Sequence, residues 1–269
     1  MGKKEAAGTD RMKAAADDPS ISSPLEEGLS KLGIPQERVL PLLLSYIKEI
    51  ELFNPAYGLV KVKDRRELII RHILDSLAPI DVIRHTLGPA FKQKTPLIAD
   101  VGSGAGLPGI PLAVCMVDAD FTLIERMGRR AGFLRDALAM LALPNARVEE
   151  AEMEKLSLEA AHRFDLIVFR AFRPLEPAIL KALFKLLAPG GTLAAYKGKR
   201  QVIEEELSCT PPAAWEIIPL EVPFLEEERH LLICRDVCHK NNTRKTQLKG
   251  EQALSRKRLE NPAAKPPST

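Results

Sequence analysis

The chain has 269 residues, of which 45% are hydrophobic and 28% charged, and its mean hydropathy is −0.08. This composition is that of a globular protein with enough apolar residues for a core. The absence of any run of 18 apolar residues excludes a membrane span. The first 23 residues lack the apolar segment of a secretory signal, and four scattered cysteines do not make a disulfide scaffold. We therefore expect a cytoplasmic protein with no membrane partner and no evident obligate protein partner.

The net charge of +3 is distributed unevenly. From Arg235 to the end, nine Lys or Arg residues outnumber three Asp or Glu residues, so this segment carries +6 and residues 1–234 carry −3. Such a segment can contact phosphates without sequence specificity, although a charge run is more often only solvated. Residues 236–269 are also without aromatic residues, so we expect a basic disordered tail.

The N-terminal third divides into a polar lead-in and a helical segment. Residues 1–24 are poor in branched apolar residues and predict a disordered lead-in. In residues 25–90 the apolar side chains recur with a helical period, first around 39–50 and then around 68–76. Between these two helices, the Asn-Pro pair and the glycine of residues 53–58 predict a turn. We expect residues 25–90 to form a small helical cap.

Residues 91–235 have the pattern of a doubly wound α/β domain. Four short, nearly continuous apolar runs predict buried parallel strands, with helices between them. The runs at 215–222 and 229–235 are separated only by a loop, which predicts an antiparallel closing hairpin. The predicted parallel strands are 97–101, 121–124, 164–169 and 192–196, and the predicted helices are about 108–116, 128–142 and 177–187.

The most informative motif is a glycine loop after the first predicted strand, Asp100-Val101-Gly102-Ser103-Gly104-Ala105-Gly106-Leu107-Pro108-Gly109. Glycines let a backbone turn tightly and approach a ligand. Glu125 ends the next strand, where a carboxylate can accept both ribose hydroxyls. Together these features predict a site for an adenosine-containing cofactor. Because Leu107 stands where a dinucleotide fingerprint has its third glycine, the spacing favours S-adenosylmethionine over NAD.

Five motifs then occur in a fixed order: Arg71-His72-Ile73-Leu74-Asp75-Ser76, the glycine loop continued to Leu112, Arg170-Ala171-Phe172, Lys197-Gly198 and Glu228-Arg229-His230. Over about residues 34–235 this set closely resembles the RsmG family, also called glucose-inhibited division protein B. The resemblance implies a class I S-adenosylmethionine-dependent methyltransferase, Rossmann-like with a seven-stranded sheet. It also implies methylation of N7 of a guanine in the 530 loop of 16S rRNA, either free or within the small ribosomal subunit or its precursor.

The cofactor site expected from the loop and the resemblance has seven members. Gly102 and Leu107 would line the pocket, Met153 and Glu154 would lie beside the adenine, and Arg170 would lie near the methionine end. Met153 could equally fill the core, and the less favoured alternative for Glu154 and Arg170 is that they are surface residues. The full set is Gly102, Gly104, Leu107, Glu125, Met153, Glu154 and Arg170. Guanine N7 carries a free lone pair, so no general base is needed and none is assigned.

Basic residues near the carboxyl ends of the fourth and fifth predicted strands are candidates for RNA contacts. The substrate residues that we expect are Arg71, His72, Arg173 and Lys197, with Lys199 and Arg200 nearby. The alternative is that they are ordinary solvated side chains. His72 could instead join Asp75 and Ser76, which share its helix face, in a structural hydrogen-bonded cluster between cap and sheet.

Three other functions remain open from the sequence. They are a methyltransferase of the same fold that acts on a small molecule or protein, a ribosome-binding module without catalysis, and, more distantly, a nicotinamide dehydrogenase. Gly58-Leu59-Val60 stands where the family usually has Asn-Leu-Thr, which leaves any substrate contact there in doubt. Cys234 and Cys238-His239 have no second Cys/His pair at ligand spacing, so we predict no metal site.

Overall fold

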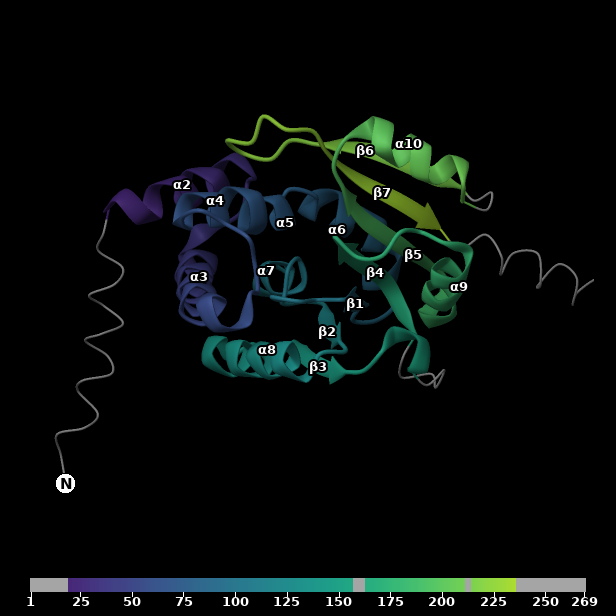
Figure 1. The fold of residues 1–269 in the computed structure, drawn as a ribbon, viewed down its shortest axis with the longest axis horizontal. Helices are drawn as coiled ribbons and strands as arrows, with labels where there is room; N and C mark the ends of the chain where they lie inside the picture. The colour runs from purple at the N-terminus through teal and green to yellow at the C-terminus, as the bar shows by residue number, and fades with distance from the viewer. Residues whose placement is uncertain (1–18, 157–162, 211–213, 236–269) are drawn as a thin grey trace, which may run out of the picture.

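The computed structural model describes residues 19–156, 163–210 and 214–235, which form a seven-stranded sheet with helices on both faces (Figure 1). The strands are β1 Leu97–Val101, β2 Asp120–Glu125, β3 Ala146–Glu150, β4 Phe164–Arg170, β5 Leu187–Lys197, β6 Trp215–Leu220 and β7 Arg229–Arg235. The cap helices are α2 Pro19–Lys31, α3 Gln36–Tyr57, α4 Arg65–Leu68, the π-helix η1 Ile69–Leu74, α5 Asp75–Leu77 and α6 Ile80–Phe91. The helices that follow are α7 Gly109–Cys115, α8 Gly128–Leu141, the 3-10 helix η2 Met153–Lys155, α9 Pro177–Leu186 and α10 Arg200–Ser208.

The strand order is β3-β2-β1-β4-β5-β7-β6. Neighbouring strands from β3 to β5 are parallel, and β7 runs antiparallel to both β5 and β6. The predicted doubly wound sheet and closing hairpin are confirmed. The chain order reverses between β1 and β4, and ligands of such sheets bind at the carboxyl ends of the strands at this point. The glycine loop after β1 therefore lies beside the segment that follows β4.

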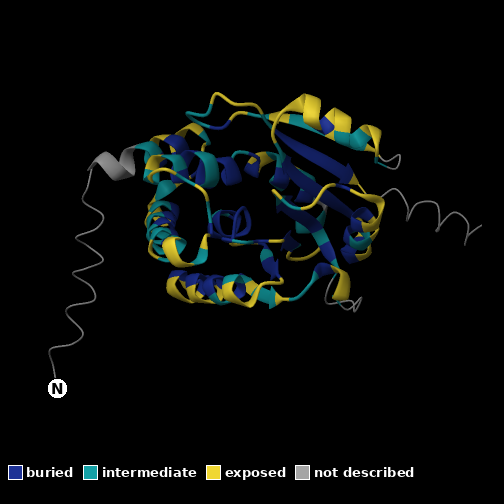
Figure 2. Ribbon diagram, viewed as in Figure 1, coloured by how far each residue is buried: buried dark blue, intermediate teal, exposed yellow. Residues whose placement is uncertain are grey.

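Side chains of the central strands alternate between two cores, one on each face of the sheet. Ile98 of β1 packs with the cap, α7 and α8, whereas Ala99 and Val101 pack with α9 and α10. Figure 2 shows the central strands as buried and the outer surfaces of the helices as partly exposed. The cap helices share one continuous core with α7 and α8, which fixes the cap against the sheet.

The cap differs from the prediction at the turn expected for residues 53–58. Helix α3 continues to Tyr57, and only Gly58, with φ 59°, leaves the helix. The Gly58 N–H donates to the Asn54 carbonyl at 2.9 Å, which closes the last turn. Pro55 removes one hydrogen bond near the helix end without stopping the helix, and the left-handed glycine ends it.

The lead-in expected at 1–24 also differs, because α2 begins at Pro19. Leu25 and Leu29 are fully buried and anchor this helix to the cap. Residues 1–18 and the predicted basic tail, residues 236–269, lie outside the described residues.

Strand β5 begins at Leu187, five residues before the predicted start. Leu187 pairs with Phe164 of β4, the pairing is then interrupted, and it resumes at Thr192, where the strand was predicted to begin. Gly190, with φ 80°, lies in this irregular stretch. In the parts of the chain that the structure describes, the helices are too short or too polar to cross a membrane.

Candidate active site

Three glycines in the left-handed region turn the chain from β1 into α7. Gly102, Gly104 and Gly106 have φ values of 72°, 57° and 90°. Asp100 supports the loop from below, since its carboxylate accepts the Gly109 N–H at 3.0 Å. Residues with a Cβ rarely adopt such angles, so the loop depends on these glycines.

Asp100 is buried beneath the loop, and its Oδ1 atom has no hydrogen-bond partner among the described residues. Burial raises the pKa of this carboxyl to about 7, and the hydrogen bond from Gly109 opposes the rise. A buried polar atom without a partner, directly under a glycine loop, indicates a place where a polar ligand group or water belongs.

Glu125, at the end of β2, holds the loop from the side. Its Oε2 accepts the Gly104 N–H and its Oε1 accepts the Met127 N–H, both at 2.9 Å. The residue is only 4% exposed. Each carboxylate oxygen has a second lone pair. Glu125 can therefore position the loop and still accept a ribose hydroxyl.

A cavity of about 280 Å³ opens beside this loop, and we call it the loop cavity. The predicted Gly102, Glu125 and Met153 line it together. Other predicted cofactor residues lie elsewhere: Leu107 packs in the core, and Glu154 is exposed and paired with Arg173 at 2.6 Å. The complete lining is Val101, Gly102, Ile124, Glu125, Arg126, Met127, Arg130, Ala151, Glu152, Met153, Ala171, Phe172 and Arg173.

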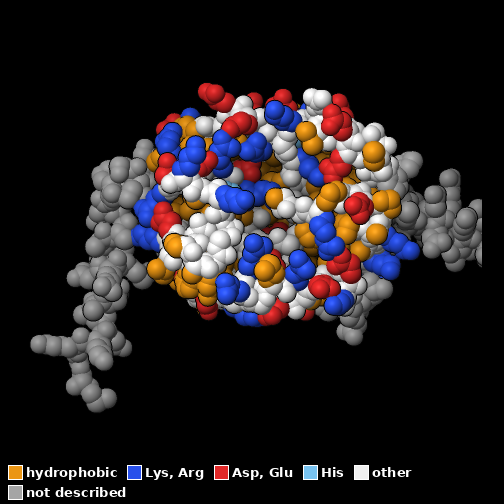
Figure 3. Space-filling model, in the orientation of Figure 1, with side chains coloured by type: hydrophobic (Ala, Val, Ile, Leu, Met, Phe, Trp, Pro, Cys, Tyr) orange, Lys and Arg blue, Asp and Glu red, His pale blue; other side chains and the backbone are white. Residues whose placement is uncertain are grey.

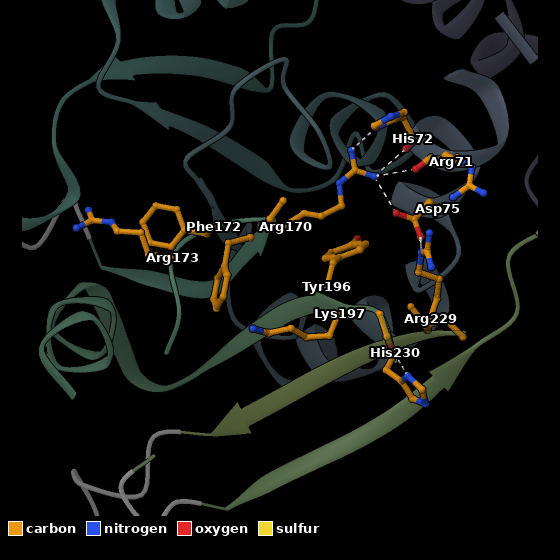
Figure 4. Close-up of a pocket in the computed structure, with 14 residues that line it drawn as sticks. Arg71, His72, Asp75, Arg170, Phe172, Arg173, Tyr196, Lys197, Arg229 and His230 are labelled. Atoms are coloured by element: carbon orange, nitrogen blue, oxygen red, sulfur yellow. Dashed lines mark hydrogen bonds and ion pairs between the residues drawn. The ribbon is translucent and has the colours of Figure 1, made fainter. Parts of the chain in front are cut away.

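A second cavity of about 460 Å³, which we call the cap cavity, lies between the cap and the ends of β4, β5 and β7 (Figure 4). The four predicted substrate residues line it, and so does Arg170, which was expected near the cofactor. The lining residues are Arg71, His72, Asp75, Phe169, Arg170, Ala171, Phe172, Arg173, Tyr196, Lys197, Gly198, Leu220, Arg229 and His230.

Asp75 links three parts of the chain in this cavity. It is 5% exposed and pairs with Arg170 Nη1 at 2.8 Å and with Arg229 Nε at 3.1 Å (Figure 4). Arg170 also donates to the Arg71 carbonyl at 3.3 Å, on the π-helix η1. π turns are frequent at functional sites. Because its partners Asp75 and the Arg71 carbonyl both belong to the cap, the guanidinium of Arg170 points into the cap, away from the loop cavity.

His72 belongs to the same cluster. Its Nδ1 lies 3.2 Å from Arg170 Nη2, and because a guanidinium only donates, Nδ1 is the acceptor. Burial and then the charges of Arg170, Arg71 and Arg229 lower the pKa of His72 to about 4. The Ser76 hydroxyl donates to the His72 carbonyl at 2.5 Å. The His72 ring is thus hydrogen-bonded to Arg170, which also pairs with Asp75, and the Ser76 hydroxyl contacts the His72 carbonyl.

The basic side chains of the cap cavity have carboxylate partners. Arg71 pairs with Glu67 and Glu227, and Lys197 pairs with Glu206 at 2.6 Å. Arg170 and Arg229 share Asp75, and Arg173 pairs with Glu154. Lys199 and Arg200 are exposed where α10 begins. Figure 3 shows Lys and Arg side chains gathered around the central hollow of this face. Any phosphate that binds here would share these cations with the protein's own carboxylates.

Sequence reasoning assigned no role to Phe172, Tyr196 or Arg229, which also line the cap cavity. Phe172 and Arg229 stand inside the recognised motifs, which was a usable signal. Tyr196 gave no signal, because its contact is distant in sequence: its hydroxyl donates to the Ser76 carbonyl at 2.8 Å and ties β5 to the cap.

The two cavities share a wall formed by Ala171, Phe172 and Arg173. Ala171 has φ 50°, in the left-handed region that a residue with a Cβ seldom adopts. This strained turn directly follows β4 and brings Phe172 against Gly102. A ligand in the loop cavity and one in the cap cavity would meet at this wall.

Comparison with known proteins agrees with this layout. A family model described as rRNA small subunit methyltransferase G, GidB, matches residues 40–232. Relatives named ribosomal RNA small subunit methyltransferase G include one from Treponema pallidum subsp. pallidum, 41% identical over 228 residues, covering 82% of this chain and 96% of the relative. One from Xanthomonas euvesicatoria pv. vesicatoria is 40% identical over 227 residues, covering 83% of this chain and 99% of the relative.

Among solved structures, a Klebsiella pneumoniae protein assigned as an O-methyltransferase aligns with a TM-score of 0.51 at 16% identity, covering 80% of this chain and 97% of that chain. At this identity the likeness concerns the fold alone, which is that of class I methyltransferases with a helical cap added at the N-terminus. The family model spans far more than half of the chain, and the sequence relatives match nearly end to end. The chain therefore belongs to the rRNA small subunit methyltransferase G family.

Proposed function

We propose that this protein transfers a methyl group from S-adenosylmethionine to N7 of a guanine in the 530 loop of 16S rRNA, within the small subunit or its precursor in the cytoplasm. Family membership supports an rRNA substrate, since the relatives are named ribosomal RNA small subunit methyltransferase G. The observation that carries the proposal is the wall of Ala171, Phe172 and Arg173 shared by the two cavities. A cofactor on one side and a base on the other would be neighbours there.

The loop cavity suits the adenosine part of the cofactor. A Cβ on Gly102 would lie 2.6 Å from the Phe172 ring, so glycine keeps this approach open. Glu125 offers lone pairs for ribose hydroxyls, and Met153 offers an apolar surface for the adenine. When bound, S-adenosylmethionine supplies an electrophilic methyl group on a sulfonium. The residues present fit such a group.

The chain's own part in the reaction is to bind and orient the base. Guanine N7 has a free lone pair, so no side chain has to remove a proton. Burial keeps the pKa of His72 at about 4, so its ring is neutral near pH 7 and adds no charge to the cavity. Arg173 and Lys197 line the cavity and can donate to guanine O6, which leaves N7 free to react. Orientation of this kind is a large part of catalysis for a displacement.

The test is mass-spectrometric nucleoside mapping of 16S rRNA from cells with and without the gene. We expect 7-methylguanosine to be present in the 530-loop fragment, to vanish without the gene and to return with the wild type. Arg170→Ala should restore little of it, and Lys92→Ala, an exposed residue away from both cavities, should restore it fully. An unchanged modification in the deletion strain would show that the substrate is wrong.

A further inference from the structure

Phe172 is the aromatic side chain of the wall shared by the loop cavity and the cap cavity. Phe169 and Tyr196 also line the cap cavity, but they are only 2% and 6% exposed. Phe172 is half-buried, so part of its ring is open to the cavity. Among the Phe and Tyr residues that line the cap cavity, it is the one whose ring is most open to a ligand.

The Phe172 ring is held at the junction from two sides. It lies so close to Gly102 that a Cβ there would come within 2.6 Å of Cδ2. The Phe169 ring meets it edge-on, with centroids 6.0 Å apart and planes at 63°. The left-handed Ala171, with φ 50°, sets the direction from which the side chain enters. Strained backbone of this kind is found where the surrounding structure fixes a side chain for function.

The ring already carries a planar cation. The guanidinium carbon of Arg173 lies 5.2 Å from the Phe172 ring centroid. The Arg173 side chain is 50% exposed and its partner Glu154 is 38% exposed, so the arginine can leave this position at little cost. A flat base could then occupy the same ring face, since unstacked RNA bases are commonly held on aromatic side chains.

We propose that the target guanine stacks on the Phe172 ring in the place now taken by the Arg173 guanidinium. This inference rests on the proposed function and names the side chain that holds the base. In the transfer, guanine N7 uses its lone pair to bond the methyl carbon, the carbon–sulfur bond breaks with its electron pair left on sulfur, and no proton leaves. The base thereby becomes a planar cation.

A cation over an aromatic face is attracted by the ring quadrupole. The Phe172 platform therefore binds the developing 7-methylguanine more strongly than the neutral guanine, which is the condition for accelerating the chemical step. The contact of Arg173 with the ring shows that this face accepts a planar cation.

Stacking has a direct spectroscopic signature that does not depend on turnover. The full chain with S-adenosylhomocysteine is mixed with 7-methylguanosine 5′-monophosphate, and the proton resonance of the 7-methyl group is followed by NMR. We expect an upfield ring-current shift with the wild type and with Phe172→Tyr, and none with Phe172→Leu. Phe224→Leu is the matched control, because Phe224 is also half-buried and also has a cation over its ring, but lines neither the loop cavity nor the cap cavity.

The kinetic arm uses small subunits from cells lacking the gene. We expect Phe172→Leu to lower kcat/KM for the subunit by about 10-fold or more, the usual size of a lost base–aromatic contact, with the Kd of S-adenosylhomocysteine unchanged within about twofold. Phe172→Tyr should restore most of the rate, and Phe224→Leu should match the wild type.

Three results would overturn the platform: no upfield shift with the wild type, an equal shift with Phe172→Leu, or an equal loss of cofactor binding and methylation in Phe172→Leu. The last result would assign the ring to the cofactor instead. If the wild type methylates no subunit but the shift still depends on Phe172, the proposed function fails and the platform stands.

Discussion

At the scale of single residues, Asp75 organises the charges of the cap cavity. Its two oxygens bind Arg170 and Arg229, which come from strands at the centre and near the edge of the sheet. A buried carboxylate needs such partners, because leaving it unpaired is strongly unfavourable. The arginines are consequently oriented by the cap. Arg170 also donates to the Arg71 carbonyl on η1, whereas Arg229 donates from Nη1 to the Glu228 carbonyl.

Arg170→Ala should weaken both folding and methylation. Asp75 would keep only the ion pair with Arg229 among those that the structure describes, so we expect the free energy of unfolding to fall by about 1.5–3 kcal/mol, the range for hydrogen bonds to charged groups. Arg170→Lys should recover part of this, since one ammonium replaces Nη1 but not the contact with His72. Urea denaturation checks it, and a change below about 0.5 kcal/mol would contradict the role.

His72 should make stability depend on pH in a defined window. Its pKa is about 4 in the folded protein and near 6.5 when unfolded, so between these values only the unfolded state binds the proton. Stability contributed by neutral His72 is therefore present above pH 6.5 and lost as pH falls toward 4. His72→Gln should have a shallower fall between pH 6.5 and 4.5 in denaturation curves. Identical slopes for both proteins would count against the buried neutral ring.

Gly102→Ala should separate backbone strain from cofactor binding. Gly33→Ala is the matched control, because Gly33 has φ 65° and open space around a Cβ, whereas Gly102 has φ 72° and Phe172 at 2.6 Å. Gly33→Ala should lower stability by about 1 kcal/mol, and Gly102→Ala by more, because its Cβ must also displace the Phe172 ring. Only Gly102→Ala should weaken S-adenosylhomocysteine binding, by about 10-fold or more in calorimetry, since about 1.4 kcal/mol corresponds to each tenfold. Equal binding by both variants would remove Gly102 from the site.

At the scale of elements, the cap is part of the main core. Buried side chains of α2 and α3 pack in the same core as those of α7 and α8. Tyr46 of α3 donates from its buried hydroxyl to the Ala105 carbonyl in the glycine loop at 2.5 Å. Burial raises the pKa of Tyr46 well above its usual value, so the hydroxyl stays protonated and remains a donor. The cap thus helps to fix the loop that lines the cofactor side.

Leu29→Ala tests this coupling of cap and sheet. Leu29 is fully buried on α2, so we expect a loss of about 2–5 kcal/mol in the free energy of unfolding. Glu27→Ala, an exposed change on the same helix, should cost under about 0.5 kcal/mol. Thermal denaturation should show one cooperative transition in both. A separate early transition of the cap in Leu29→Ala would argue that the cap folds independently.

At the scale of the whole molecule, the excess positive charge is concentrated in the C-terminal part of the sequence. Residues 1–234 carry −3, and the segment from Arg235 onward carries +6. Within the described residues, the cations of the cap cavity are neutralised by carboxylates. Nonspecific attraction to RNA phosphates should therefore come mainly from the C-terminal segment.

Deleting residues 240–269 should lower RNA binding more than cofactor binding. The salt dependence of RNA binding should also become weaker, because fewer phosphate contacts release fewer counterions. Filter binding of 16S rRNA at several salt concentrations and calorimetry with S-adenosylhomocysteine measure the two effects. Equal loss of both, or loss of neither, would show that the segment does not serve RNA binding.

The sequence alone determined the features that depend on short-range chemistry. Continuous apolar runs predicted the buried parallel strands, because such strands bury both faces. The glycine spacing predicted the loop at the end of β1, because only glycine adopts its angles cheaply. The end of α3 was missed, since packing of the cap outweighs a proline in the last helical turn.

The tertiary structure alone decided how the site is divided. Asp75 meets Arg170 and Arg229 across 95 and 154 residues of sequence, so no local pattern could show that Arg170 points into the cap. The same holds for Phe172, which became the wall between two cavities only when β4 was placed beside β1. The spacing of glycines and apolar residues along the sequence predicts backbone conformation, whereas the pairing of buried charges depends on which strands and helices the fold brings together.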